Sequence, residues 1–356
     1  MTRYLLWIIL FILFCVRVIY FYQTQPSYPN DTKIRITDRI TSEPIRYSNS
    51  QYIKLQGFKI YLPHYPEIYY GDRVVIEGKV QDDKLIEVRL VDKKEDKGFL
   101  YNFRRELLGF YQKSLPQPHS ALIAGVTIGS KSNLGNDFWE ALKKTGTAHV
   151  VVASGMNVTL VAKFLIATIV VFLPRKRAIP LALAGVWGYA LLSGFEAPII
   201  RAAVMGSITF ASQEIGRLYY AWRALLISAF GMLFIRPEWI TDVGFILSFA
   251  ATASLMLFEA KVRKFIKFVP SIIREDFSTS LAAQVGVAPV LFVTFGQFNI
   301  LSPIINAVVL WTIVPMTIIG MVSGIIGLIF EPIGTLILWL AYPLTSWFIL
   351  VVGTFS

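Results

Sequence analysis

The sequence predicts a polytopic α-helical membrane protein with a small all-β domain near its N-terminus. Hydrophobic residues make up 55% of the 356 residues and charged residues only 16%, and the mean hydropathy is +0.57. Several apolar runs reach the roughly 20 residues that a helix needs to cross a bilayer. One stretch near the N-terminus instead alternates apolar and polar residues, as half-buried strands do.

The first apolar run, from Tyr4 to Tyr22, predicts a transmembrane anchor within residues 1–25. Arg17 interrupts this run, and we expect its side chain to reach toward the membrane interface. The residues from Gln23 to Pro26 make a poor cleavage site, so we expect an anchor that is not removed.

Residues 30–95 have the composition of a soluble β domain. Five short segments alternate apolar and polar residues, and they begin near Lys33, Tyr52, Phe58, Arg73 and Leu85. Five short strands in about 60 residues suit a small barrel, for which an OB-fold is the best match.

Basic and aromatic residues are interleaved in this β domain. The basic residues are Lys33, Arg35, Arg39, Lys54, Lys59 and Arg73, and the aromatic residues are Tyr47, Tyr52, Phe58, Tyr61, Tyr69 and Tyr70. Together they can form a stacking groove that guides single-stranded nucleic acid. The alternative is a solvated β surface with the aromatic rings in the core, and the sequence leaves both open.

Residues 98–146 predict short helices that do not span the membrane. Residues 98–115 place apolar side chains at helical spacing, which predicts an amphipathic helix on the membrane surface that ends at Pro116. The apolar run from Ala121 to Gly129 is too short to span and predicts a buried or re-entrant helix. Residues 137–144 predict another short amphipathic helix.

Residues 147–356 predict a multi-helix transmembrane domain. Its apolar segments are 147–173, 178–194, 198–215, 219–235, 240–258, 281–296, 301–330 and 333–351. Pro315 predicts a kink within residues 301–330. The net charge of +11 fits either basic cytoplasmic loops or attraction of a polyanion. Cationic loops at 175–177 and 261–267 predict a cytoplasmic N-terminus, with the β domain and the C-terminus outside.

Polar residues within or beside the apolar segments are the candidate lining of a polar path. They are His149, Ser154, Gly155, Asn157, Arg201, Asp242, Ser248 and Gln284. Polar groups in a bilayer cost free energy unless they find a partner or face water. Arg201 can bind phosphate or form an ion pair with Glu196 or Asp242. Asp242 can also cap a helix, and Gln284 can hold helices together.

The sequence does not predict an enzyme. The three histidines match no zinc-ligand spacing, and no Walker A motif is present. A serine hydrolase needs a base within reach of its nucleophile, but His149 precedes Ser154 by five residues and lies about 140° around a helix from it. We therefore expect a transport channel without a metal or another cofactor.

Six motifs follow one another in a specific order. They are Ala121 to Gly129, Lys144 to His149, Ala153 to Val158, Tyr189 to Gly194, Pro198 to Ala203 and Asp242 to Phe249. In this combination the chain resembles the ComEC-type competence family, the DNA-internalisation channel of bacterial transformation. The resemblance extends over nearly the whole chain, including the N-terminal anchor and the β domain.

The resemblance implies passage of single-stranded DNA through the cytoplasmic membrane during natural transformation. It also implies a DNA receptor, a nuclease and a cytoplasmic ATPase or helicase as partners. The family usually carries a histidine where Asn157 stands, and an asparagine cannot change its charge. Many relatives continue into a metallo-β-lactamase-like domain, whereas this sequence has no His-x-His-x-Asp-His cluster. We therefore expect another protein to degrade the second strand.

A second function remains open from the sequence. A permease or an assembly scaffold for a non-DNA substrate can use the same fold. The asparagine at position 157 and the lack of a nuclease-like cluster keep this alternative in view. The sequence predicts no oligomeric state.

Overall fold

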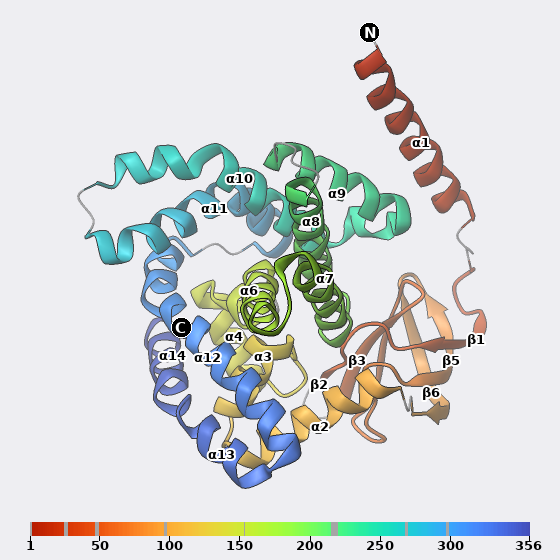
Figure 1. Ribbon diagram of the computed structural model, residues 1–356. Coiled ribbons are helices and arrows are strands. Elements are labelled where there is room, and N and C mark those ends of the chain that lie inside the picture. The colour runs from red at the N-terminus through yellow and green to blue at the C-terminus, as the bar shows by residue number, and fades with distance from the viewer. Residues whose placement is uncertain are drawn as a thin grey trace.

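The computed structural model describes residues 2–24, 28–46, 50–95, 98–152, 154–214, 220–267, 270–296 and 299–356. The chain begins with helix α1 (Thr2–Thr24), continues into a β domain and ends in a large helical part. Figure 1 shows the strands gathered on one side of the helices, with α1 extending away from both. Tyr47, one of the predicted groove aromatics, lies outside the described residues.

The β domain is a six-stranded sheet. Its strands are β1 (Lys33–Arg39), β2 (Ile45–Arg46), β3 (Ser50–Leu55), β4 (Phe58–Pro63), β5 (Arg73–Gln81) and β6 (Lys84–Lys94). They are ordered β1-β5-β6-β4-β3-β2, and β4 and β6 pair in parallel while the other pairs are antiparallel. Alternate residues of β5 are buried, because successive side chains of a strand point to opposite faces. The predicted β domain is confirmed, with one more short strand than expected.

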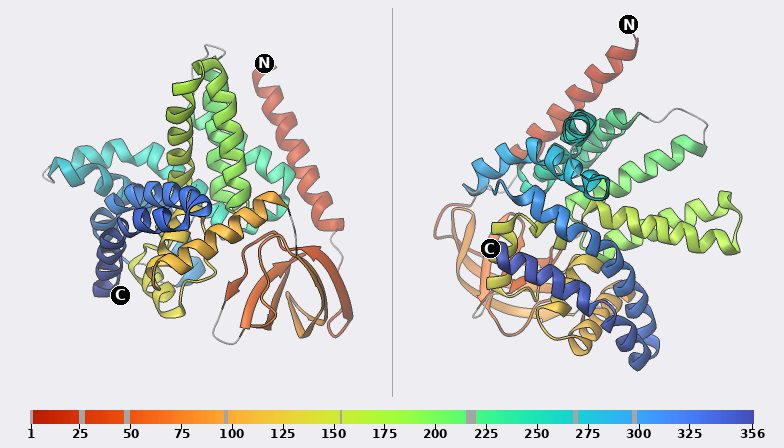
Figure 2. Two further views of the ribbon diagram at one scale, coloured as in Figure 1. Left: turned by 60° about the horizontal axis from the view of Figure 1, so that its bottom comes forward. Right: turned by 90° about the vertical axis from the view of Figure 1, so that its left-hand side faces the viewer.

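Thirteen α-helices follow the sheet in the described residues. They are α2 (Phe99–Ser114), α3 (His119–Ile128), α4 (Asn136–Thr145), α5 (Ala148–Val151), α6 (Gly155–Phe172), α7 (Arg175–Leu192), α8 (Ala197–Glu214), α9 (Ala221–Ile235), α10 (Val243–Phe265), α11 (Ser271–Phe295), α12 (Ser302–Ile329), α13 (Glu331–Trp339) and α14 (Tyr342–Phe355). A 3-10 helix, η1 (Pro237–Thr241), precedes α10. In both views of Figure 2, α6 and α7 project together from the other helices.

Several of these helices are apolar enough to cross a membrane. Among the described residues, four segments are long enough: Val243–Phe265, Phe277–Thr294, Ser302–Ile329 and Ala148–Phe172, the last of which includes both α5 and α6. The pair α13 and α14 makes a fifth if it counts as one bent span. Helix α9 has only 15 residues, fewer than the roughly 20 that a straight span requires.

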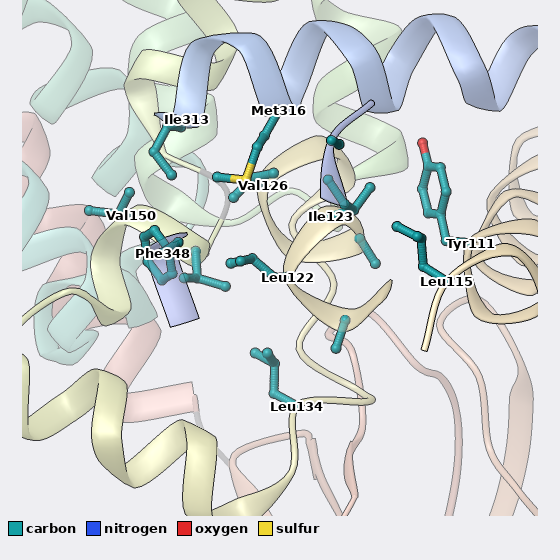
Figure 3. Packing of buried hydrophobic residues seen from close by; sticks show 14 of the residues in the cluster. Tyr111, Leu115, Leu122, Ile123, Val126, Leu134, Val150, Ile313, Met316 and Phe348 are labelled. Atoms are coloured by element: carbon teal, nitrogen blue, oxygen red, sulfur yellow. The ribbon is translucent and has the colours of Figure 1, made fainter. Parts of the chain in front are cut away.

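Helix α3 lies at the centre of the main hydrophobic core. All its residues from Ser120 to Ile128 are buried, and α2, α12 and α14 surround it (Figure 3). A ten-residue helix is too short to cross a bilayer, and here protein buries nine of its ten residues. This burial agrees with the buried helix that the run from Ala121 to Gly129 predicts.

Helix α2 packs its apolar side against α12. Tyr111 is fully buried, and its hydroxyl donates to the Gly320 carbonyl at 2.8 Å. A Cβ atom on Gly327 would lie 2.3 Å from the Phe110 ring, so glycine is what allows the close approach. This side of α2 is therefore covered by protein, and the expectation that residues 98–115 lie on a membrane surface stays a prediction.

The C-terminal helices break at a different place from the expected one. Pro315 lies inside the continuous helix α12, whereas the predicted span 333–351 is divided into α13 and α14 with a bend of 46°. Pro343 stands in the first turn of α14, where the missing N–H of proline costs no helical hydrogen bond. The break between α13 and α14 is thus marked by a proline at the start of a helix, Pro343, and not by Pro315 inside α12.

Candidate functional site

The apolar stretch 147–173 is not one helix. Helix α5 ends at Val151, Ser154 has extended backbone angles of −114° and 170°, and α6 begins at Gly155. Ala153 lies outside the described residues. His149 is exposed on α5, where its Nδ1 donates to the Gly146 carbonyl at 2.9 Å. The break leaves the first turn of α6 facing the neighbouring helix α8.

Arg201 is the charged centre of this region. Its Nε donates to Ser248 Oγ at 2.7 Å, which joins α8 to α10, and its Nη1 lies 3.7 Å from Met205 Sδ. A Cβ atom on Gly155 would lie 2.9 Å from Arg201 Nη2, so the guanidinium rests against the start of α6. The structure thus brings together three predicted path residues: Gly155, Arg201 and Ser248.

The expected carboxylate partners of Arg201 are engaged elsewhere. Glu196 Oε1 lies 2.6 Å from Lys131 Nζ, and Asp242 caps α10 by accepting from the Phe245 backbone nitrogen at 2.7 Å. Within the described part of the chain, no carboxylate oxygen lies within 4.0 Å of the Arg201 guanidinium. A charge held by a hydroxyl and a thioether, without a counter-charge, can attract an anion.

Asn157 and Gln284 lie apart from the Arg201 contacts. Asn157 is fully buried and its Nδ2 donates to the Val126 carbonyl of α3 at 3.0 Å. It follows Gly155 by two residues, so it faces about 160° away from that glycine around α6. Gln284 Nε2 donates to the Asn299 carbonyl at 3.0 Å, which ties α11 to the segment before α12.

The predicted basic residues of the β domain form two groups. Lys33, Arg35 and Arg39 share one face of β1, where Arg39 stands opposite Arg73 of β5. Lys54 of β3 stands opposite Lys59 of β4, so β6 separates this second group from the group on β1 and β5.

Acidic neighbours reduce the charge of both basic groups. Arg35 lies 3.7 Å from Glu77, and Lys59 lies 2.6 Å from Asp83. Solvent-exposed pairs of this kind are weak and screened by salt. A polyanion can therefore compete for these cations.

A cleft of about 660 Å³ separates the β domain from the helices. Its lining is mostly polar and includes Arg46, His64, Arg105, Gln112 and Asn133. Tyr69 also lines the cleft. The Cζ atoms of Arg46 and Arg105 lie 5.0 and 5.1 Å from the centre of its ring. These cations are balanced by nearby carboxylates, since Arg46 Nη2 lies 3.1 Å from Glu67.

The sequence analysis missed a buried polar junction beside this cleft. Glu43 of the β domain, Arg104 of α2 and Lys131 after α3 are in contact there. One signal was available: Arg104 is on the same helical face as Leu107 and Tyr111, three and seven residues later, which are core positions. A charged residue at such a position needs a buried partner.

The family model described as "Competence protein" matches residues 126–356. The chain belongs to this family. The resemblance to ComEC-type competence proteins is confirmed, and every predicted path residue, from His149 to Gln284, lies within the matched region. The β domain lies before that region.

Three named proteins match part of the chain. ComE operon protein 3 of Bacillus subtilis (strain 168) is 26% identical over 236 residues, which cover 65% of this chain and 30% of that protein. Competence protein ComA of Neisseria gonorrhoeae is 29% identical over 220 residues, which cover 56% of this chain and 30% of that protein. The uncharacterized protein YcaI of Escherichia coli (strain K12) is 27% identical over 247 residues, which cover 64% of this chain and 32% of that protein.

The chain therefore spans about a third of the length of these curated relatives. No solved structure matches it.

Proposed function

We propose that the chain forms a channel for uptake of single-stranded DNA across the cytoplasmic membrane during natural transformation. Membership of the Competence protein family and the similarity to Competence protein ComA support this role. The observation that carries it is Arg201, a guanidinium among apolar helices that has a hydroxyl partner and, among the described residues, no carboxylate within 4.0 Å. DNA carries one negative charge per nucleotide, and such a cation lowers the free energy of a phosphate beside it.

The path that we propose is lined by His149, Ser154, Gly155, Asn157, Arg201, Asp242, Ser248 and Gln284. A channel for a long polyanion needs weak and repeated contacts, because the strand must leave each site as well as bind it. One cation, with no carboxylate within 4.0 Å among the described residues and with mostly uncharged polar residues along the path, fits that requirement better than a cluster of arginines. The chain would need no cofactor for this role.

The β domain would lie outside the membrane as an OB-fold-like module that guides the strand. The parallel pair of β4 and β6, in a sheet otherwise antiparallel, supports this fold assignment. The guiding residues would be the two basic groups, Lys33, Arg35, Arg39 and Arg73 on one side and Lys54 and Lys59 on the other. The N-terminus would be cytoplasmic and the C-terminus outside. A DNA receptor, a nuclease and a cytoplasmic ATPase or helicase would complete the machinery.

Uptake of fluorescent DNA into a nuclease-protected cytoplasmic pool tests the proposal. We expect the pool to be lost in cells without the chain and strongly reduced with Arg201→Ala, while Arg201→Lys keeps part of it because the charge remains. Arg236→Ala is the control, since this arginine pairs only loosely with Glu238 at 4.0 Å, outside α8 and α10. Unchanged uptake without the chain would refute the channel and favour a permease or scaffold for another substrate.

A further inference from the structure

Glu43 connects the β domain to the helical part of the chain. It lies between β1 and β2, and its carboxylate accepts hydrogen bonds from Ser130 Oγ and from the backbone nitrogen of Lys131, each at 2.6 Å. Both donors belong to the turn that follows α3. Short hydrogen bonds to a carboxylate are among the stronger ones, so they fix the two segments to each other.

Arg104 reinforces the same contact from α2. Its Nη2 lies 3.1 Å from Glu43 Oε1, and the two side chains are only 5% and 9% exposed. The guanidinium also donates to the carbonyl oxygens of Ile128 and Leu192, the last residues of α3 and α7. Desolvation of both charges offsets much of their attraction, so the pair adds little net stability, whereas removal of one partner would leave an uncompensated buried charge.

Lys131 extends the contact to the helix that carries Arg201. Its Nζ lies 2.6 Å from Glu196 Oε1, and Glu196 is the residue before α8. The Glu196 carbonyl accepts from the backbone nitrogens of Ile199 and Ile200, so the first turn of α8 starts from it. Arg201 follows Glu196 by five residues, less than two helical turns.

The turn between α7 and α8 has two residues with positive φ angles. Gly194 has a φ of 86° and Phe195 a φ of 51°. A bulky residue in this left-handed region is strained and persists only where other contacts hold it. The β domain contacts the preceding turn directly, because the Tyr70 hydroxyl donates to the Leu191 carbonyl at 3.2 Å.

We propose that Glu43, Lys131 and Glu196 are positioning residues, which set the place of α8, and so of the Arg201 guanidinium, according to how the β domain is docked. A displacement of the β domain is then transmitted through Lys131 to the first turn of α8. The effect on DNA uptake rests on the proposed function, in which Arg201 contacts DNA. The effect of the β domain on the position of α8, which is the mechanical part of the inference, does not depend on that function.

A distance measurement tests the mechanical part without DNA. Spin labels at Lys54→Cys on β3 and Ala211→Cys on α8, in a Cys15→Ser background, report the separation in the purified full chain in lipid nanodiscs. We expect one narrow distance distribution, which becomes broader or shifted with Lys131→Glu or with Glu196→Lys. The double variant restores opposite charges and is expected to restore the original distribution.

A second ion pair provides the matched control. Lys79 Nζ lies 2.6 Å from Glu87 and joins β5 to β6 within the β domain, away from the contact with the helices. Exchange of these two charges is expected to leave the distribution unchanged. In the uptake assay, we expect each single variant at 131 or 196 to reduce the amount of protected DNA about tenfold, and the double variant to restore it. A change of this size lies within the range of coupling energies between contacting residues.

Unchanged distributions in both single variants overturn the inference. Altered distances together with full uptake support the positioning role but count against Arg201 in the DNA path, so the two failures are distinguishable. If either charge reversal prevents folding, Glu43→Gln gives the same measurement, since it keeps the size of the side chain and removes only its charge. An unchanged distribution in Glu43→Gln then overturns the inference as well.

Discussion

Gly155 and Ser248 should be energetically coupled through Arg201. In Gly155→Ala, the new Cβ would lie 2.9 Å from Arg201 Nη2. Carbon and nitrogen atoms prefer about 3.5 Å, so the guanidinium must move by about 0.5 Å. That displacement weakens its hydrogen bond to Ser248 Oγ, now 2.7 Å long. A hydrogen bond to a charged group contributes about 1.5–3 kcal/mol.

The single substitution alone will show little. Alanine in the middle of a helix is about 0.5–1 kcal/mol more favourable than glycine, and part of this gain at Gly155, the first residue of α6, offsets the weakened hydrogen bond. The coupling is more informative. We expect Ser248→Ala to lower the free energy of unfolding by about 2 kcal/mol in the parent chain, and by about 1 kcal/mol or less once Gly155 is alanine.

A double-mutant cycle compares the parent chain, Gly155→Ala, Ser248→Ala and the double variant. Unfolding by dodecyl sulfate in mixed micelles, followed by fluorescence of the eight tryptophans, gives the four free energies of unfolding. Gly206→Ala is the control, because it lies on α8 and its added Cβ would meet nothing within 4 Å. It should be additive with Ser248→Ala. Additivity of Gly155→Ala with Ser248→Ala to within about 0.5 kcal/mol would refute the shared contact with Arg201.

Three further predictions concern packing and pH. Tyr111→Phe removes the buried hydrogen bond to the Gly320 carbonyl and should lower the free energy of unfolding by about 1 kcal/mol in the same assay. Gly334→Ala should cost more, about 1–3 kcal/mol, because the added Cβ would lie 2.2 Å from Gly327 Cα; a smaller change would mean that α13 can shift freely. Burial, and next the neighbouring Tyr101, raise the pKa of Tyr70 to about 12 from 10.0. The folded chain therefore resists ionisation of this phenol, and stability should fall as pH rises from about 10 to 12, a loss that Tyr70→Phe should remove in alkaline unfolding titrations.

Local patterns in the sequence were sufficient to locate the β domain and the short buried helix. Alternation over residues 73–81 gives β5, because every second side chain of that strand enters the core. The length of the run from Ala121 to Gly129 excluded a span. Neither inference requires knowledge of a distant residue.

The candidate site was predictable only in part. Arg201 is conspicuous among apolar residues, but its partner Ser248 lies 47 residues away, and the sequence offered two carboxylates instead. The junction was missed for the same reason, since Lys131 contacts Glu196 across 65 residues and Glu43 across 88. Contacts of this kind depend on tertiary packing, which no local pattern reports.

The central position of α3 has a consequence for how the chain is made. Residues 119–128 are synthesised early, yet the helices that cover them include α12 and α14, which extend to Phe355. At about 5–20 residues per second, a ribosome needs on the order of 10–50 s to make the intervening chain. Throughout that interval the apolar surface of α3 lacks its final neighbours, and a segment of this length is too short to anchor itself in a bilayer. We therefore expect α3 to need protection from aggregation until α12 and α14 have been synthesised.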